Sequence, residues 1–310
     1  MTKLYLVVPC YNEQEVLPTT NSILINKMQE LIERNRISKE SRILYVDDGS
    51  RDTTWELISS YHNENELVSG IKLAHNRGHQ NALLAGLEKA KEECDCAISL
   101  DADLQDDIGI FDEFITKFEE GCDVVYGVRK KRETDTFFKR ATAEGFYKVM
   151  EIMGAKIVFN HADYRLMSRR ALEALSEYKE VNLFLRGIIP HIGYKSDIVY
   201  YDRKERTAGE SKYPLKKMLS FAFDGITSFS TNPLKWITNF GVFLFFVSIV
   251  GLVVSLFTKA FVGFWGVAVL IGFACALNLV AIGIVGTYIG KIYAETKARP
   301  RYKIETYLKK

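Results

Sequence analysis

The chain has 310 residues, of which 47% are hydrophobic and 26% are charged, which is ordinary for a folded protein and argues against disorder. A formal net charge of +2 is too small to indicate a nucleic-acid partner. The five cysteines form no CxxC pair and no Cys/His cluster, so they indicate a reducing compartment and argue against structural zinc.

Residues 1 to about 130 alternate short apolar runs with amphipathic stretches. The apolar runs predict strands at Leu4–Val8, Arg42–Val46, Val68–Leu73, Cys96–Leu100 and Asp123–Tyr126. The stretches between them predict helices near Glu15–Arg36, Thr53–His62, Asn81–Lys91 and Ile110–Glu119. The first run is too short for a signal peptide, so the amino terminus is expected in the cytosol. The alternation predicts a parallel sheet covered on both faces, with ligands at the carboxyl ends of its strands.

Acidic residues follow the fourth predicted strand. Alternate residues of an extended chain point the same way, so Asp101, Asp103 and Gln105 are expected to converge. Two carboxylates and an amide oxygen suit Mg²⁺ or Mn²⁺, which completes its shell with diphosphate oxygens. A solvated turn is the alternative. An EF-hand loop does not fit, because it needs Gly at Asp106 and Glu at Asp112.

Polar clusters also follow the other strands. Asp48, in the run Asp47–Ser50, suits ribose hydroxyls or a base N–H, although a turn with Asp52 as N-cap is the alternative. Tyr11 and Glu13 follow the first strand and could stack on and hydrogen-bond a nucleoside, or form an ordinary strand exit. The loop Asn76–His79 is as compatible with a plain helix start as with a substrate contact.

Two long apolar runs predict a membrane hairpin. Phe240–Phe257 has about 18 residues without a charge and Phe261–Ile289 about 29, against the ~20 that span a bilayer. Lys and Arg flank both ends of the pair, so the large domain and both termini are expected in the cytoplasm. Phe137–Val158 is predicted to be a helix, packed either on the core or on a lipid surface. The predicted parts are a catalytic domain at 1–210, an amphipathic interfacial helix at 211–235, the hairpin at 236–290 and a basic tail at 291–310.

The motifs together resemble the family 2 glycosyltransferases, and within them the polyprenyl-phosphate branch of dolichol-phosphate mannose synthases and bactoprenol glucosyltransferases. They read Pro9-x-Tyr11-Asn12-Glu13, Asp47-Asp48-Gly49-Ser50, Asn76-Arg77-Gly78, Asp101-Ala102-Asp103-Leu104-Gln105 and Arg206-x-x-Gly209-x-Ser211-Lys212. The similarity covers nearly the whole chain, including the carboxy-terminal hairpin. It implies an α/β catalytic domain with the Rossmann-like glycosyltransferase-A fold.

The resemblance also implies roles for individual residues. The nucleotide would contact Pro9, Tyr11, Glu13, Asp48, Asp101 and Ala102. The metal would bind Asp103 and Gln105, with Asp101 beside it. The acceptor phosphate would meet Arg129 and either Arg140 or Lys139. Arg206 and Lys212 would lie in a loop that closes over the diphosphate, and Asp163 would lie near the acceptor unless it only pairs with Arg165.

The expected reaction is the metal-dependent, inverting transfer of a sugar from a nucleotide-sugar to polyprenyl phosphate, such as undecaprenyl phosphate. It would take place at the cytoplasmic face of the plasma membrane. UDP-glucose is the favoured donor, with UDP-N-acetylglucosamine, other UDP-sugars and GDP-mannose left open. Relatives and the glycine-rich spans suggest a homo-oligomer, specifically a tetramer. A processive polysaccharide synthase would need a QxxRW motif and more spans, and intact Asp103, Gln105 and Arg206 disfavour an inactive nucleotide-binding adaptor.

Overall fold

A computed structural model of the chain describes residues 1–130, 161–181, 184–202, 232–258 and 264–310. These residues fall into two compact units. The first contains 1–130, 161–181, 184–202 and 300–310, and the second contains 232–258 and 264–299.

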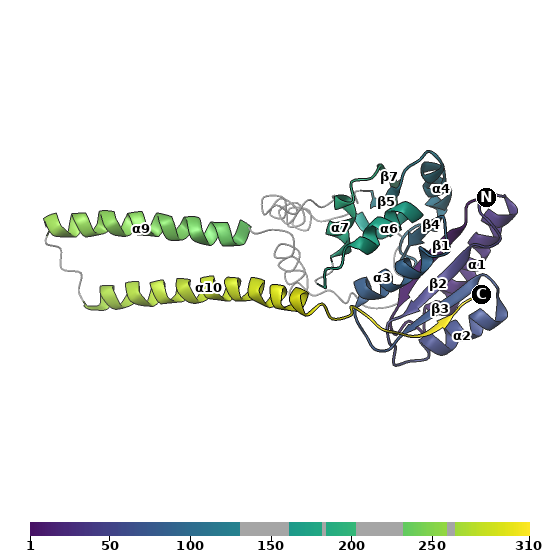
Figure 1. Ribbon diagram of the computed structural model, residues 1–310, viewed down its shortest axis with the longest axis horizontal. Coiled ribbons are helices and arrows are strands. Elements are labelled where there is room, and N and C mark those ends of the chain that lie inside the picture. Colours follow the sequence, from purple (N-terminus) through teal and green to yellow (C-terminus); the bar gives the residue numbers. More distant parts are fainter. Residues whose placement is uncertain (131–160, 182–183, 203–231, 259–263) are drawn as a thin grey trace. The chain divides into compact units, whose positions relative to one another are not determined.

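The first unit is built on a sheet of eight strands among the residues described (Figure 1). The strands are β1 (Leu4–Cys10), β2 (Arg42–Asp47), β3 (Val68–Leu73), β4 (Cys96–Ser99), β5 (Val124–Arg129), β6 (His161–Ser168), β7 (Ser196–Tyr201) and β8 (Ile304–Leu308). Their order across the sheet is β7-β5-β6-β4-β1-β2-β3-β8. All five predicted strands are therefore present, within a few residues of the expected bounds.

The centre of the sheet, β3-β2-β1-β4, is parallel as predicted. The five predicted strands all run in one direction, but the sheet as a whole is mixed, because it includes two reversed strands that were not predicted. β6 runs antiparallel between β4 and β5, and β8 runs antiparallel along β3. Because β6 is reversed, its first residues lie at the same edge of the sheet as the last residues of β4 and β5.

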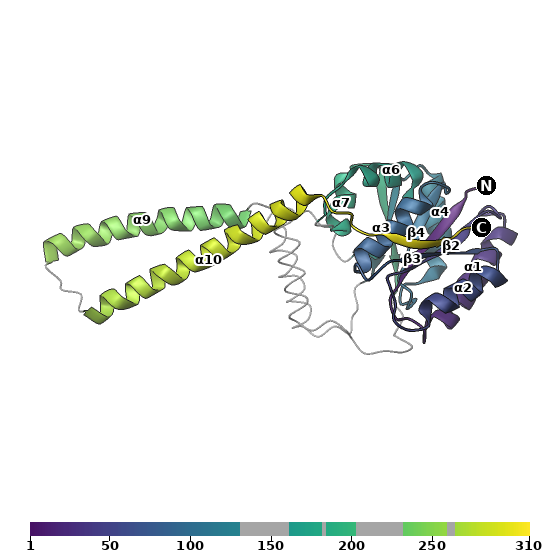
Figure 2. The ribbon, with the colours of Figure 1, turned by 60° about the horizontal axis from the view of Figure 1, so that its bottom comes forward.

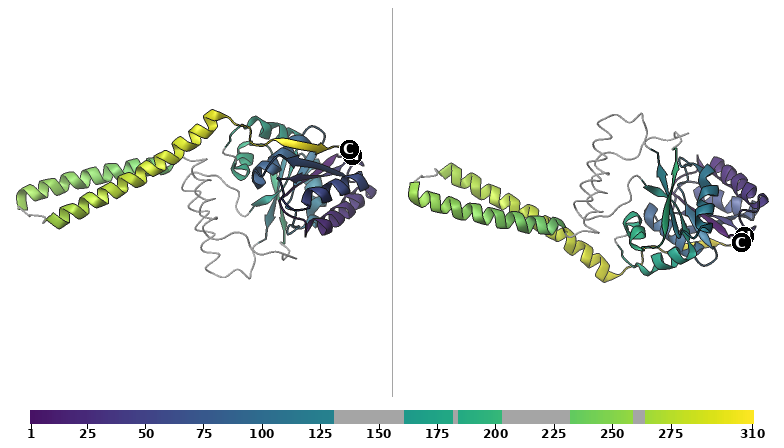
Figure 3. Two further views of the ribbon diagram at one scale, coloured as in Figure 1. Left: turned by 90° about the horizontal axis from the view of Figure 1, so that it is seen from below. Right: turned by 90° about the horizontal axis from the view of Figure 1, so that it is seen from above.

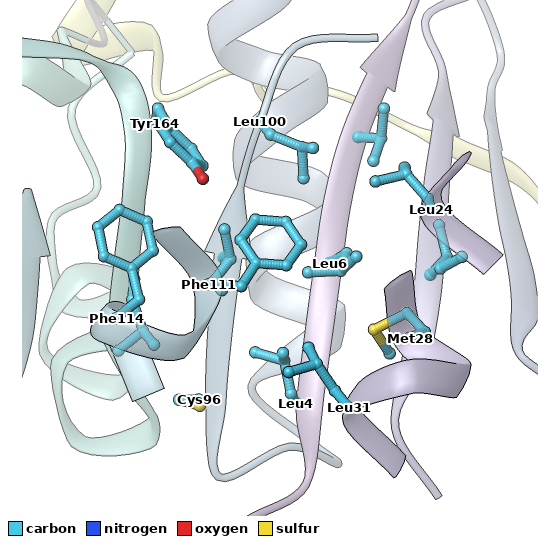
Figure 4. Close-up of a cluster of buried hydrophobic side chains, with 14 of the residues drawn as sticks. Leu4, Leu6, Leu24, Met28, Leu31, Cys96, Leu100, Phe111, Phe114 and Tyr164 are labelled. Carbon is cyan, nitrogen blue, oxygen red and sulfur yellow. The ribbon is translucent and has the colours of Figure 1, made fainter. Parts of the chain in front are cut away.

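Helices cover both faces of this sheet (Figure 2). The helices of the first unit are α1 (Leu17–Glu33), α2 (Thr54–Glu64), α3 (His79–Ala90), the short 3₁₀ turn η1 (Ile108–Ile110), α4 (Phe111–Glu119), α6 (Arg169–Glu177) and α7 (Leu185–His191). Side chains of α1, α2 and α4 share one hydrophobic core with the strands. Figure 4 shows part of that core, including Leu6 of β1, Met28 of α1 and Phe111 of α4.

α3 packs on β1 and β2 at very short range. A Cβ at Gly86 would lie 2.4 Å from Val7 Cγ1 and 2.8 Å from Val46 Cγ2. Glycine allows this close approach, which fixes the position of α3 on the face of the sheet.

The second unit contains the long helices α9 (Asn232–Thr258) and α10 (Phe264–Lys297), which run side by side in opposite directions (Figure 3). Within the described ranges, one helical segment, Leu277–Lys297, is long and apolar enough to cross a membrane by length and composition alone. The two-span hairpin therefore stays a prediction. The predicted interfacial helix at 211–235 lies almost entirely outside the described residues.

The predicted basic tail, 291–310, is not simply a tail. Its first residues continue α10. Residues 304–308 form β8 at the edge of the eight-stranded sheet, yellow beside β3 in Figure 2. The backbone N–H of Ala74 donates to the carbonyl of Lys303 at 2.9 Å just beyond the paired strands.

Candidate active site

The candidate site lies along one edge of the sheet. The carboxyl ends of β1, β2, β3, β4 and β5 meet there, together with the amino end of β6. This edge brings together Tyr11, Asp48 and Asp101, which follow β1, β2 and β4 or lie next to their ends, with Arg129 at the end of β5 and Asp163 near the start of β6. In sheets of this kind the carboxyl edge is where ligands bind.

The loops after β1 and β2 are joined by side-chain hydrogen bonds. The Asn12 amide donates to Ser50 Oγ at 3.0 Å, and Arg51 N–H donates to Asn12 Oδ1 at 2.9 Å. Glu13 N–H donates to Thr54 Oγ1 at 2.9 Å. Asn12 has a φ of 53°, which asparagine tolerates better than most residues. The predicted nucleoside-binding segment is thus held against its neighbour before any ligand binds.

Asp48 holds the loop after β3. Its Oδ1 accepts from the Arg77 amide at 2.7 Å and its Oδ2 from the Gly78 amide at 2.8 Å, and the residue is only 2% exposed. Burial raises the pKa of this carboxyl, and the two amides only partly oppose the rise. Next to it, a Cβ on Gly49 would lie 2.7 Å from Asn76 N, and its φ of +66° also favours glycine. Asp48 therefore has a structural task besides the predicted contact with nucleoside, which stays a prediction.

A pocket of about 300 Å³ opens beside these loops. Its lining comprises Tyr11, Gly49, Ser50, Arg51, Lys72, Leu73, Ala74, His75, Asn76 and Glu305. Of the predicted nucleotide contacts, Tyr11 lines it and is 37% exposed. Pro9, Glu13, Asp48, Asp101 and Ala102 are not among the lining residues of this hollow.

The segment after β4 turns sharply. Leu104 N–H donates to the Asp101 carbonyl at 3.3 Å, and Leu104 has a φ of 46°. The chain is therefore not extended here, so the reason given for the convergence of Asp101, Asp103 and Gln105 is wrong, while their shared metal site stays a prediction. Thr20 Oγ1 of α1 donates to the carbonyl of Ala102 at 2.6 Å, and this hydrogen bond holds the turn against α1. Gln105 is 5% exposed, and its N–H donates to Asp103 Oδ1 at 3.2 Å.

The predicted metal ligands fit a site in which the protein supplies only some of the ligands and the substrate phosphates and water supply the rest. Among the described residues, no group of three His, Cys, Asp or Glu side chains is arranged to hold a metal. Mg²⁺, however, is commonly held by one or two carboxylates with the remaining ligands from substrate phosphates and water. The side chains of Asp101 and Asp103 are accessible enough to supply that partial set, since Asp101 has 44% of its side chain exposed and Asp103 is half-buried.

Asp101 is linked to Asp163 through a histidine. His79 Nε2 lies 3.0 Å from Asp101 Oδ1, and His79 Nδ1 lies 4.0 Å from Asp163 Oδ2. Burial favours neutral His79, but the hydrogen bond and charge of Asp101, with the charge of Asp163, raise its pKa overall. His79 begins α3, so the helix position set by Gly86 also sets this contact.

Asp163 is held by two arginines. Arg165 pairs with its Oδ1, while Arg186 Nη2 lies 3.1 Å from its Oδ2 and Arg186 Nε donates to Oδ1 at 3.3 Å. Burial alone would raise the pKa of Asp163, but Arg186, Arg165 and His79 together hold it well below the ordinary value. The predicted ion pair with Arg165 is present, and it does not exclude the predicted place near the acceptor.

Arg129 ends β5 and is fixed by two partners. Its Nη2 lies 3.2 Å from Asp106 Oδ1, and its Nε donates to the Tyr201 hydroxyl at 3.1 Å. Burial disfavours the charge of Arg129, but Asp106 and Tyr201 raise its pKa overall, so the guanidinium stays charged. Its side chain is 29% exposed, and it lies at the carboxyl end of β5.

The other predicted contacts, Lys139, Arg140, Arg206 and Lys212, lie outside the described residues. Sequence reasoning left the role of His79 open, within the loop Asn76–His79, and missed Arg186 and Glu305. His79 adjoins the Asn76–Gly78 motif, which was a usable signal. No local pattern in the sequence predicts that Arg186 contacts Asp163, which lies more than 20 positions earlier. Likewise, none predicts that Glu305 lies beside pocket residues more than 200 positions earlier.

Comparisons with known proteins show the family to which the chain belongs. The family model described as "Glycosyl transferase family 2" matches residues 5–176, which is more than half of the chain. The chain is 54% identical over 306 residues to "Uncharacterized glycosyltransferase YkoT" of Bacillus subtilis (strain 168), covering 97% of this chain and 91% of that protein. It is 39% identical over 312 residues to "Bactoprenol glucosyl transferase" of Shigella phage SfX, covering 98% of this chain and 99% of that protein.

Among solved structures, glucosyl-3-phosphoglycerate synthase from Mycobacterium tuberculosis, in complex with Mn²⁺, UDP and phosphoglyceric acid, matches with a TM-score of 0.44. That match has 15% identity and covers 73% of this chain and 76% of that chain. The family match and the parallel-centred mixed sheet confirm the predicted glycosyltransferase-A fold. The chain belongs to the family 2 glycosyltransferases, and within them it is similar over almost its whole length to the bactoprenol glucosyl transferases.

Proposed function

We propose that this glycosyltransferase moves a sugar from a nucleotide-sugar, with UDP-glucose favoured, to polyprenyl phosphate, with undecaprenyl phosphate the favoured acceptor. The observation that carries the proposal is the 39% identity, over nearly the full length of both chains, to a protein named for glucosylating bactoprenol. The geometry supports it, because a nucleoside-sized pocket and an acidic turn lie along one sheet edge.

The donor is proposed to lie along this edge. Its nucleoside would stack on Tyr11, and its diphosphate would extend toward Asp101 and Asp103. Mg²⁺ or Mn²⁺ would be held by Asp103 and Gln105, with Asp101 beside it, and would neutralise charge on the leaving diphosphate. Arg206 and Lys212 remain proposed contacts of the same diphosphate.

The acceptor is proposed to need little help from a general base. A phosphate monoester with a second pKa near ~6 is largely dianionic at neutral pH and is already a nucleophile. Asp163 supports this proposal, since a carboxylate with a strongly lowered pKa is a poor proton acceptor. We therefore assign Asp163 an orienting role, in which it holds Arg186 and His79 in place.

The acceptor phosphate is proposed to meet Arg129, with Arg140 or Lys139. Arg129 is suited to this because Asp106 and Tyr201 keep it charged and fix its direction. Attack on the anomeric carbon from the side opposite the diphosphate would invert its configuration.

The enzyme is proposed to work at the cytoplasmic face of the plasma membrane, with both termini in the cytoplasm. The apolar segment Leu277–Lys297 and the Lys and Arg residues flanking the predicted spans support this placement. Glycines in the predicted spans support close helix packing and a homo-oligomer, for which a tetramer is the working proposal.

The test is sugar transfer by the purified full-length enzyme. Radiolabelled UDP-glucose, UDP-N-acetylglucosamine and GDP-mannose would each be offered with undecaprenyl phosphate, in Mg²⁺, in Mn²⁺ and in EDTA. The expected result is a lipid-linked product from UDP-glucose that EDTA prevents. A product from another donor would correct the sugar, and a product in EDTA would remove the metal from the proposal. Nucleotide binding without any product would instead favour the adaptor alternative.

A further inference from the structure

The last strand of the chain forms one wall of the nucleoside pocket. Glu305 of β8 lines that pocket together with Tyr11 and the loops after β2 and β3. It is the one lining residue that comes from beyond α10, more than 200 positions from the others. The pocket is therefore closed on this side by a part of the chain that the family model, which ends at residue 176, does not include.

Ion pairs and hydrogen bonds fix this strand to the body of the first unit. Arg301 Nη2 lies 3.2 Å from Glu88 Oε1, and Tyr302 donates to the same carboxylate. Lys309 Nζ lies 2.8 Å from Glu93 Oε1. Glu88 and Glu93 thus bind the chain on both sides of Glu305. These contacts fix the position of Glu305 in the pocket.

Glu305 is paired in the pocket with Lys72 of β3. Their Oε1 and Nζ atoms are 3.6 Å apart, and their side chains are 49% and 28% exposed. The register of β3 and β8 shifts between Lys72 and Leu73, a bulge that redirects side chains at this point. A half-exposed ion pair contributes only ~0–1 kcal/mol to stability, so holding the strands together is a weak reason for two charges inside a pocket.

We propose that Lys72 and Glu305 bind the base of the donor nucleotide and select its identity, so that β8 is part of the donor site. This rests on the proposed function, which puts a nucleotide in the pocket. Lys72 supplies hydrogen-bond donors and Glu305 only acceptors. A base with a carbonyl next to a ring N–H, as in uracil and guanine, matches that order. Cytosine and adenine present a ring nitrogen acceptor next to an amino group, which reverses it.

The experiment measures nucleotide binding by calorimetry on the full-length enzyme in detergent with Mg²⁺. UDP and CDP are the ligands, since they differ only in this edge of the base. Wild type is expected to bind UDP more tightly than CDP. Glu305→Gln and, separately, Lys72→Met are expected to weaken UDP binding about tenfold and to narrow the UDP-to-CDP preference, as loss of a charged hydrogen bond predicts.

A matched control is available at the carboxyl end of α3. Lys89 and Glu92 form a similar exposed pair, 2.9 Å apart, and neither lines the pocket. Glu92→Gln and Lys89→Met remove the same charges and should leave UDP affinity and base preference unchanged within about twofold. Thermal unfolding of every variant would identify any that fails to fold, and the two pocket variants provide independent tests.

The outcomes separate the two proposals. UDP affinity and base preference that survive both pocket substitutions would overturn the role of β8 while leaving sugar transfer intact. Equal losses in the α3 controls would show a general charge effect and overturn it as well. A wild-type enzyme that binds no nucleotide would refute the proposed function itself.

Discussion

Asp163 compensates a buried positive charge, and removing it should be costly. Arg165 is 1% exposed, and its Nε and Nη1 have no hydrogen-bond partner among the described residues. Asp163 is its carboxylate partner in the structure. Removing one member of a buried pair typically costs ~3–5 kcal/mol, because the other charge is left without compensation. Arg186, with 34% of its side chain exposed, should add no more than ~1 kcal/mol.

The measurement is thermal unfolding of the full-length enzyme in detergent. For a unit of this size, each kcal/mol lowers Tm by ~2–4 °C, so Asp163→Ala should lower Tm by ~6–20 °C. Arg186→Met should lower it by no more than ~4 °C. The double variant Asp163→Ala with Arg165→Met removes both buried charges and should recover much of the loss.

The double variant tests whether the loss of stability comes from the uncompensated charge of Arg165. A double variant no more stable than Asp163→Ala alone would refute the account, because the cost would then not come from the uncompensated Arg165 charge. The pH dependence gives a second check. The pKa of Asp163 is lowered in the folded state. The contribution of its charge to folding stability is therefore present above the unfolded-state pKa of ~3.9 and is lost as pH falls below that value toward the folded-state pKa. The difference in stability between wild type and Asp163→Ala should therefore persist above pH 5, reduced only by the part that depends on charged His79, which is lost as His79 gives up its proton at higher pH.

Three further outcomes are expected. Gly49→Ala should destabilise by more than ~2 kcal/mol and weaken UDP binding. Gly193→Ala, also at positive φ but with a Cβ no closer than 3.9 Å to the His191 carbonyl oxygen, should cost only ~1 kcal/mol; equal thermal shifts would contradict the steric argument. The pKa of His79 is raised in the folded state, so charged His79 makes a small contribution to folding stability. That contribution is complete below the unfolded-state pKa of ~6.5 and is lost as pH rises through the folded-state pKa. In EDTA, the stability gap between wild type and His79→Gln should shrink from pH 6 to 9, and a constant gap would exclude the contact with Asp101. Asp103→Ala should reduce sugar transfer at least ~100-fold without loss of folding, measured by product formation and thermal unfolding, and substantial residual turnover would remove Asp103 from the metal site.

The parallel centre of the sheet could be predicted because its signals are local. β1, β2 and β4 are almost continuous apolar runs followed by polar residues, which is the pattern of a strand buried on both faces. The loops at their carboxyl ends, with Tyr11, Asp48 and Asp101, were placed at one edge by the same rule.

The remainder depends on pairing between distant segments. β6 lies between β4 and β5, and this insertion brings Asp163 to the edge near Asp101. No pattern within residues 161–168 specifies that neighbour. The turn after β4 was missed for a different reason, since Leu104 adopts a positive φ that is unusual for leucine. β8 was hidden because its few apolar residues are embedded in a basic segment.

The position of β8 in the chain has a consequence for biosynthesis. Leu73 and Ile304 are neighbours across the sheet, but about 230 residues separate them along the chain. At ~5–20 residues per second, a ribosome needs roughly 10–50 s to supply the strand that covers β3. During that interval β3 is an open sheet edge, the kind of surface that pairs with other chains. Completion of the pocket that Glu305 lines must therefore follow synthesis of α10, so a nascent chain cannot have this pocket in full before its long apolar helices have been made.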